Sequence, residues 1–315
     1  MSLASIRAES PRCVPNPIMD VCNVVGCIQC ESEERLVENH GALCCESCGA
    51  SFLISENIVK CVASIGSLTP LAGEWNEFYE KNIKPYSAET DWWRLSCWRT
   101  HLFEHVVGDL AEKLVVDLGC GTASRVAAIT PLRSHAYRYI GIDSSMDALQ
   151  HARLALPGGL FIHADLDSLR LHPEQADVVL CLGVLMYFSD FTKPLNKVLH
   201  ALKHGGILLL HEQVLRQSWG QMAASIFKSS RHIYPFSQGI PLEGLKENLV
   251  KYGSIVHIHL TGSPWRTLFM KMCDGTFLQP LRPYAAWLDS LLCATVGRIF
   301  PVLGASEAQI VFQKA

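Results

Sequence analysis

From Lys113 onward, short apolar runs alternate with stretches of helical apolar spacing, and this alternation limits the fold more than any other feature. It is typical of a parallel sheet whose strands are joined by crossover helices. We expect strands at 114–118, 138–142, 160–163, 177–182, 206–211, 254–260 and 308–312, and helices at 124–129, 145–156 and 191–203. The fold class is therefore α/β, with seven strands in the sheet.

The loop after the first expected strand carries the most informative motif. Asp117 lies at the end of an apolar run, and a Gly-x-Gly turn from Gly119 to Gly121 opens the following helix. Glycines allow a positive φ and a close approach of the backbone to a ligand, and open α/β sheets bind nucleotides at this end of their strands. A nicotinamide-binding loop would carry a third glycine where Ser124 stands. A sulfonium and amino-acid ligand suits Asp117 better than a pyrophosphate does.

Two further acids follow the next two expected strands. Asp143 lies 22 residues after Gly121, where its carboxylate could accept both ribose hydroxyl protons. Asp165 follows the third strand, where it could accept from an adenine amino group. The ribose contact is common to dehydrogenases and methyltransferases, so it does not separate them. Three acids at successive strand ends nevertheless favour a nucleoside site over scattered surface charge.

Three stretches resemble the class I S-adenosylmethionine-dependent methyltransferases, in particular those of type 11. Residues 117–122, Asp-Leu-Gly-Cys-Gly-Thr, are similar to the first motif of the family, and residues 177–188 to its fourth-strand segment. Residues 202–209 are similar to its Leu-Lys-Pro-Gly-Gly turn, with His204 in place of proline, and Ala123 replaces a common glycine. The resemblance implies a Rossmann-like methyltransferase sheet of seven strands that ends in an antiparallel hairpin.

The resemblance also implies a site for S-adenosylmethionine. By position, Asp117 and the glycine turn would hold the methionine end, Asp143 the ribose and Asp165 the adenine. The backbone at 182–184 would lie beside the methyl donor. The cofactor-binding residues implied in this way are Asp117, Gly119, Cys120, Gly121, Asp143, Ser144, Ala164, Asp165, Leu182 and Gly183.

The expected reaction is an in-line displacement on a sulfonium methyl group, in which positioning and desolvation carry much of the rate. A base matters only where the acceptor loses a proton. His211 is the first candidate base and Tyr187 the second, with a structural role as the alternative for each. Residues 181–184 lack the Asn/Asp-Pro-Pro-Tyr signature that resembling enzymes use on planar amino groups. We therefore expect a small-molecule acceptor, with oxygen, nitrogen and carbon all open as the acceptor atom.

A second motif lies near the start of the chain, where eight of the 13 cysteines precede residue 62. Clustered cysteines without a signal peptide favour metal over disulfides. The two Cys-x-x-Cys pairs, separated by fourteen residues, predict a structural four-thiolate zinc site on Cys27, Cys30, Cys45 and Cys48. Cys44 adjoins Cys45 and could replace it through a register shift. The module resembles the short zinc ribbons that precede some methyltransferase domains.

The chain thus divides into a flexible arm at 1–20, a zinc-ribbon-like module at 21–62, an aromatic-rich helical lid or linker at 63–110, and a methyltransferase domain at 111–315. An insertion at about 261–307 interrupts the last domain, and its stretch 284–300 has one apolar face that predicts a helix. The lid could close over cofactor and acceptor with the side chains of Trp75, Tyr79, Tyr86, Trp92 and Trp93.

Charge and hydropathy limit the partners. The net charge of −3 and the lack of a Lys/Arg-rich run make nucleic acid an unfavoured substrate. No apolar stretch suits a signal peptide or a membrane span, so we expect a cytoplasmic protein without a membrane partner. A homodimer stays open. The competing functions are an RNA methyltransferase, which a basic groove from ribbon to cleft would favour, a protein methyltransferase, and a non-catalytic cofactor-binding adapter.

Overall fold

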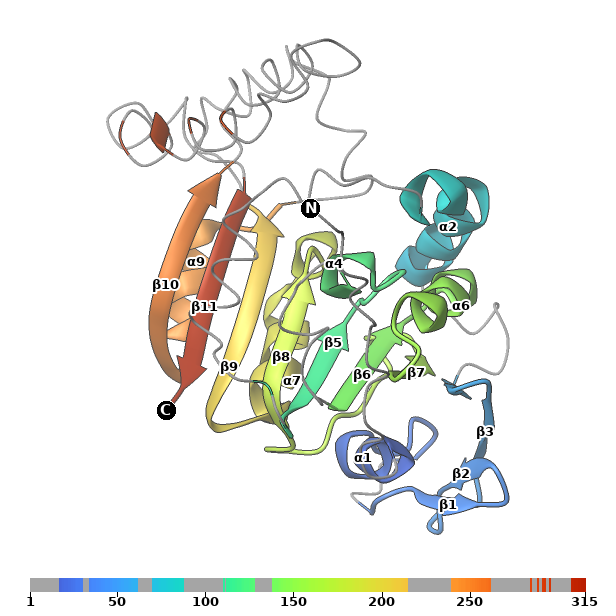
Figure 1. Cartoon of the computed structure of the whole chain (residues 1–315). Helices are drawn as coiled ribbons and strands as arrows, with labels where there is room; N and C mark the ends of the chain where they lie inside the picture. Colours follow the sequence, from blue (N-terminus) through green and yellow to red (C-terminus); the bar gives the residue numbers. More distant parts are fainter. Residues whose placement is uncertain are drawn as a thin grey trace, which may run out of the picture.

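The computed structural model describes residues 17–30, 34–61, 70–87, 110, 112–127, 138–214, 239–261 and 307–315, with residues 284, 288, 291, 292 and 295. A twisted sheet lies at the centre, with helices on both of its faces (Figure 1). In the described residues its strands follow the order β1-β2-β3-β4-β7-β6-β5-β8-β9-β11-β10.

All seven strands expected after Lys113 are present. β5 to β9 run parallel, and β11 lies antiparallel between β9 and β10, as the resemblance implies for the closing hairpin. Their bounds are β5 (Leu114–Leu118), β6 (Arg138–Asp143), β7 (Leu160–His163), β8 (Ala176–Leu182), β9 (Leu202–Gln213), β10 (Gly253–Thr261) and β11 (Glu307–Lys314). Every residue of β5 is buried, as a strand covered on both faces requires.

The expected total of seven strands is too small, because the sheet has 11 strands within the part of the chain that the structure describes. The additional four belong to the cysteine-rich segment and are β1 (Val37–Asn39), β2 (Ala42–Cys44), β3 (Ser51–Ser55) and β4 (Ile58–Lys60). β4 pairs in parallel with β7, with Val59 opposite Ile162. The Cys61 N–H continues the ladder by donating to the His163 carbonyl over 3.0 Å. The ribbon is therefore hydrogen-bonded into the sheet edge rather than tethered ahead of it.

Helices cover the two faces of the sheet and bury their apolar sides against it. The short α4 (Ser124–Ala127) and α6 (Met146–Ala155) pack on one face, and α7 (Thr192–Ala201) and α9 (Leu242–Leu249) on the other. Ser145 caps α6, since its hydroxyl accepts from the Ala148 N–H over 3.3 Å. The 3-10 helix η3 (Leu185–Tyr187) follows β8.

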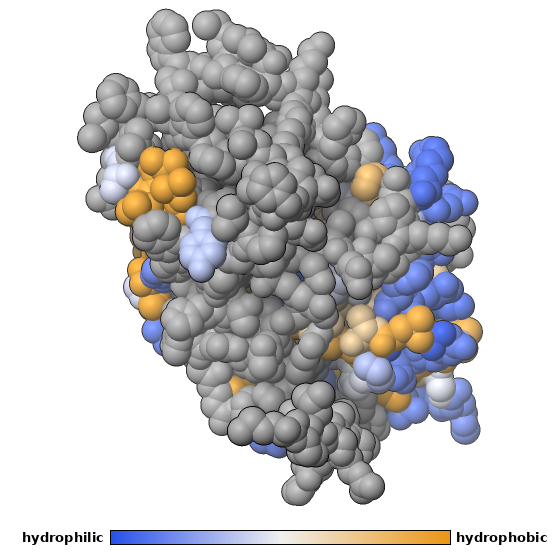
Figure 2. All heavy atoms as spheres, turned by 45° about the horizontal axis from the view of Figure 1, so that its top comes forward, coloured by the Kyte–Doolittle hydropathy of each residue, from blue (hydrophilic) through white to orange (hydrophobic). Residues whose placement is uncertain are grey.

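Two helices lie in the segments that precede β5. α1 (Pro17–Val24) begins within the expected arm and packs in the same core cluster as the ribbon. α2 (Pro70–Ser87) falls within the expected lid, buries Tyr79 and carries the exposed ion pair of Lys81 with Glu77 on its outer side. Hydrophilic side chains gather on the right of Figure 2, the side on which Figure 1 places α2 and α6.

Several expectations fall outside the described residues. They are the arm at 1–16, the aromatic rings of Tyr86, Trp92 and Trp93, and most of the insertion, in which residues 284, 288, 291 and 292 are helical. Among the helices that the structure describes, none combines the length and apolar character needed to span a membrane.

Candidate active site and metal centre

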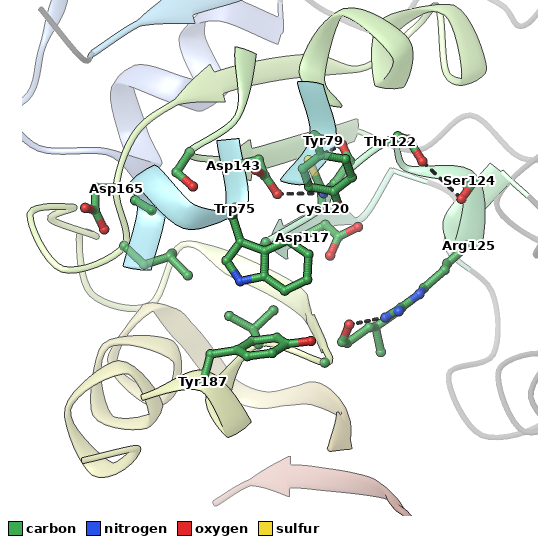
Figure 3. A pocket seen from close by; sticks show the side chains of 18 of the residues that line it. Trp75, Tyr79, Asp117, Cys120, Thr122, Ser124, Arg125, Asp143, Asp165 and Tyr187 are labelled. Atoms are coloured by element: carbon green, nitrogen blue, oxygen red, sulfur yellow. Dashed lines mark hydrogen bonds between the residues drawn. The ribbon is translucent and has the colours of Figure 1, made fainter. Parts of the chain in front are cut away.

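A cavity of about 110 Å³ opens at the carboxyl ends of β5, β6, β7 and β8 (Figure 3). Open α/β sheets bind ligands at this end of their strands. The described residues that line it are Ala72, Trp75, Tyr79, Asp117, Gly119, Cys120, Gly121, Thr122, Ser124, Arg125, Asp143, Ser144, Asp165, Leu166, Leu182, Gly183, Val184, Tyr187 and Phe188.

The glycine turn has a conformation and a packing that only glycine permits. Gly119 and Gly121 have φ angles of +63° and +54°, in the left-handed region. A Cβ on Gly119 would lie 2.5 Å from a methyl group of Val184, and one on Gly121 would lie 2.5 Å from the hydroxyl oxygen of Tyr79. The turn is thus enclosed on one side by Val184, which directly precedes η3, and on the other side by Tyr79 of α2.

Asp143 connects the turn to the second strand. Its carboxylate accepts from the Gly121 N–H over 2.7 Å and from the Ser145 N–H over 2.9 Å. Burial raises the pKa of this carboxyl above its usual value, while the backbone N–H groups oppose that effect. Asp143 therefore braces the turn and also borders the cavity.

Asp117 is the most strongly perturbed acid of the cavity. Burial raises its pKa to about 7, against the opposing effects of the Tyr139 hydroxyl and the Arg125 charge. The Tyr139 hydroxyl donates to its carboxylate over 2.8 Å. A carboxyl poised in this way near neutral pH gains from a cationic ligand, which stabilises its ionised form.

The third acid, Asp165, lies at the opposite end of the cavity from α4 (Figure 3). Its carboxylate accepts from the Asp167 N–H over 3.1 Å, which fixes the start of the loop after β7. Ala164, the neighbouring residue, is buried, and its N–H donates to the Asp143 carbonyl over 3.0 Å. Ala164 thus links the two strand ends without lining the cavity.

Glu212 holds the wall formed by the segment after β8, although it does not line the cavity. The fully buried carboxylate accepts from the N–H groups of Val184, Leu185 and Met186 over 3.2, 3.1 and 3.0 Å. Burial raises its pKa to about 7. In the sequence, Glu212 follows His211 at the end of an apolar strand. That position indicates a strand-end group, and the prediction of His211 as the base overlooked it.

Arg125 is a second residue that the motifs did not single out. It projects from α4 into the cavity, and its guanidinium donates to the Leu182 carbonyl (Figure 3). A charged residue on the apolar side of a predicted helix that follows a glycine turn is the available sequence signal.

Comparison with known proteins agrees with this geometry. Residues 116–210 match the family described as a methyltransferase domain. The chain carries a class I S-adenosylmethionine-dependent methyltransferase domain. Its sheet is that of this fold, and S-adenosylmethionine is the cofactor of the family.

The curated relatives of this methyltransferase are distant. It is 26% identical over 185 residues to the trans-aconitate 2-methyltransferase of Rhizobium leguminosarum bv. trifolii, a match that covers 54% of this chain and 70% of that one. It is 30% identical over 121 residues to the trans-aconitate 2-methyltransferase of Azoarcus sp., covering 36% and 47%. The fold is also similar to that of the cyclase SpnF, with a TM-score of 0.51, 19% identity, and 78% and 98% coverage.

The structure brings nine of the ten implied cofactor residues to the cavity of the methyltransferase, and Ala164 is the exception. Of the two candidate bases, Tyr187 lines the cavity, with its ring centroid 4.9 Å from that of Trp75. His211 is 3% exposed, and its Nε2 lies 3.2 Å from a carboxylate oxygen of Glu307. It is not among the described residues that line the cavity.

The four cysteines predicted to bind metal lie together in the ribbon. Their sulfur atoms are all within 4.8 Å of one another, with Cys27 and Cys48 3.7 Å apart and Cys30 and Cys45 3.6 Å apart. A tetrahedral zinc site with Zn–S bonds of about 2.3 Å needs S···S distances of roughly 3.8 Å, so this arrangement fits zinc. The thiol of Cys44 instead lies 3.6 Å from the Ser51 hydroxyl, which opposes the register shift.

Proposed function

We propose that this methyltransferase transfers the methyl group of S-adenosylmethionine to a small molecule that carries a carboxylate. The observation that supports this best is the cavity itself, which lies at the carboxyl ends of the strands and is lined by the three strand-end acids and by Arg125. Both relatives named above are trans-aconitate 2-methyltransferases, whose acceptor is a carboxylic acid. Because identity is low and coverage is partial, trans-aconitate is a test compound here rather than the assigned substrate.

Each strand-end acid has a role in this proposal. Asp117 would take the cationic amino group of the cofactor, Asp143 its ribose hydroxyls and Asp165 its adenine amino group. Gly119, Cys120 and Gly121 would approach the methionine end, with Ser144 beside the ribose. Leu182 and Gly183 would border the methyl group, while Trp75 and Tyr187 would form the acceptor wall.

The proposed reaction needs no side chain to act as a base. When bound, the cofactor supplies a methyl group on a positively charged sulfur. A carboxylate acceptor is already ionised at neutral pH and loses no proton, so that no general base is needed. The buried pairing of His211 with Glu307 is compatible with such an acceptor. For a hydroxyl or amine acceptor, Tyr187 and His211 stay the predicted bases.

The test is product detection. Purified protein is incubated with methyl-labelled S-adenosylmethionine and either trans-aconitate, a metabolite extract or total cellular RNA and protein, and the products are separated and identified by mass spectrometry. We expect a labelled methyl ester of a small carboxylic acid. Labelled RNA or protein would contradict the small-molecule proposal, and tight cofactor binding with no labelled product in any sample would favour the adapter.

A groove beside the ribbon bears on the RNA alternative. Arg35, Arg170 and Lys197 line it together with Cys30, so it carries positive charge. Among the described residues, it meets the cofactor cavity only along the loop after β7, since Asp165 and Leu166 line the cavity whereas the next residues line the groove. That junction lies at the proposed adenine end. A nucleic acid in this groove would therefore be remote from the methyl group.

We also propose that the four clustered thiols hold one structural zinc ion per chain. Their spacing and sulfur separations fit a closed tetrahedral site, which leaves no position for a reacting water. Elemental analysis of protein purified without chelator should find about one zinc per chain, a stoichiometry set by one complete ligand set. Metal-free protein with an intact fold would contradict the proposal. The cytoplasmic location and the homodimer stay predictions.

A further inference from the structure

Arg125 is unusual among the groups of the cavity because of its charge. The described lining residues include three acids, Asp117, Asp143 and Asp165, whereas Arg125 alone among them is a permanent cation. Its charge acts on the two most perturbed buried acids of this region, since it opposes the rise in the pKa values of Asp117 and Glu212. The guanidinium therefore lies near the strand ends that carry Asp117 and Glu212.

The position of the guanidinium is fixed by the end of β8. It donates to the Leu182 carbonyl, and a Cβ on Gly183 would lie 3.3 Å from its Nη1 atom and 3.8 Å from Nη2. Gly183 has a φ of +82°, so the backbone turns there in a conformation that favours glycine. In Figure 3 the Arg125 side chain extends from its helix toward the strand end that would border the methyl group.

A second cation would be unfavourable at this place. The cofactor carries a sulfonium charge, and two positive charges in a cavity of low dielectric repel each other unless an anion lies between or beside them. A guanidinium presents N–H donors in a planar fork that matches a carboxylate. A carboxylate group beside the guanidinium would offset the second positive charge and match the planar fork of donors.

We propose that Arg125 binds a ligand carboxylate in the cavity. This inference rests on the proposed function for its cofactor. Two sources supply that group: the methionine carboxylate of the cofactor and a carboxylate of the acceptor. Both put the same chemistry on the same guanidinium, and binding measurements separate them.

The experiment compares the wild-type protein with Arg125→Gln and Arg125→Lys by calorimetry. S-adenosylhomocysteine and 5′-deoxy-5′-methylthioadenosine are titrated into each protein, since the second compound lacks the amino-acid end. Trans-aconitate is then titrated into protein saturated with S-adenosylhomocysteine. Arg170→Gln, at an exposed arginine that lines the groove and not the cavity, is the matched control.

Loss of a charge-assisted carboxylate contact should weaken binding roughly 10- to 100-fold. If Arg125→Gln loses this factor for S-adenosylhomocysteine and not for methylthioadenosine, the carboxylate is the cofactor's. If Arg125→Gln loses affinity only for trans-aconitate, the carboxylate that Arg125 binds is that of the acceptor. Arg125→Lys should fall between, because it keeps the charge without the fork.

Three results would overturn the inference. One is unchanged binding of both carboxylates by Arg125→Gln, and another is an equal loss for the two nucleosides, which would indicate a structural role. If Arg125→Gln does not fold, the wild-type protein and Arg125→Lys provide the test. The third result is then a wild-type protein that binds the two nucleosides with equal affinity, together with an Arg125→Lys variant that loses no affinity. Wild-type protein that binds no S-adenosylhomocysteine would refute the proposed function as well, and that result is distinct from the other three.

Discussion

At the scale of single residues, the strand-end acids of this methyltransferase serve the protein and its ligand together. Asp143 already accepts two backbone N–H bonds, from Gly121 and Ser145, before any ligand is considered. A carboxylate has about four lone-pair sites, so ribose hydroxyls can still donate to it. The position of the glycine turn and the recognition of the ribose therefore depend on one side chain.

We predict that Asp143→Ala weakens S-adenosylhomocysteine binding by about 1.5–3 kcal/mol, the usual range for hydrogen bonds to a charged group. Asp143→Asn should cost less, because an amide oxygen can still accept one of the two backbone N–H bonds. Calorimetry on both variants measures this, with the exposed Glu247→Gln as a control. Unchanged affinity in Asp143→Ala would remove Asp143 from the cofactor site.

Asp117 leads to a prediction about protons. Its pKa of about 7 in the ligand-free protein should fall when the cationic amino group of the ligand binds, so that binding releases a proton below about pH 7. Affinity for S-adenosylhomocysteine should therefore rise with pH through this range. Tyr139→Phe should shift the rise to higher pH, because it removes a donor to the ionised form. Binding enthalpies that do not depend on the ionisation enthalpy of the buffer would contradict the assignment.

At the scale of elements, the pairing of β4 with β7 makes the ribbon part of the sheet. The strands pair Lys60 with His163, and the His163 imidazole lies 2.9 Å from the Ser144 carbonyl oxygen. Residues of the ribbon such as Leu43 and Phe52 belong to the same core cluster as Ile140 of β6. The cysteine-rich segment is thus continuous with the strands that end in Asp143 and precede Asp165.

We predict that Cys27→Ser disturbs the cofactor site as well as the ribbon. Loss of one ligand should weaken metal binding and loosen β3 and β4, and the freed edge should expose β7. Hydrogen exchange should accelerate at residues 160–163, and S-adenosylhomocysteine affinity should fall. Cys44→Ser is the control, since its thiol lies outside the four-sulfur cluster. Faster exchange confined to residues 21–61 would show that the ribbon is independent.

The sequence predicts local features of the fold better than long-range ones. Apolar periodicity and the glycine turn identify all seven strands after Lys113, and the cysteine spacing identifies the cluster of four thiols. The pairing of β4 with β7 has no local signal, because Ile58–Lys60 is short and its partner lies about a hundred residues later. The site residues Arg125 and Glu212 were missed for the same reason. Each one forms hydrogen bonds with backbone groups that lie far away in the sequence.

At the scale of the whole molecule, burial of ionisable groups at the strand ends links stability to pH. Glu212 is fully buried, and its pKa is raised from 4.5 to about 7. Asp117 is perturbed in the same direction, from 3.8 to about 7. In the unfolded chain both groups ionise near their ordinary values. Between pH 4.5 and 7 the folded protein therefore binds more protons than the unfolded chain, and its stability should fall as pH rises.

We predict that Glu212→Gln reduces this fall. The substitution keeps an acceptor for the N–H groups of the segment after β8 but removes the titration, so the variant should lose less stability than the wild type as pH rises. The amide must find a partner for its own N–H groups, and that cost should be nearly independent of pH. Urea unfolding of the cofactor-free proteins at pH 5 and pH 8 measures the difference, which should change by on the order of 1–3 kcal/mol in favour of the variant. Parallel stability curves would mean that Glu212 is ionised throughout, with its three N–H bonds outweighing burial.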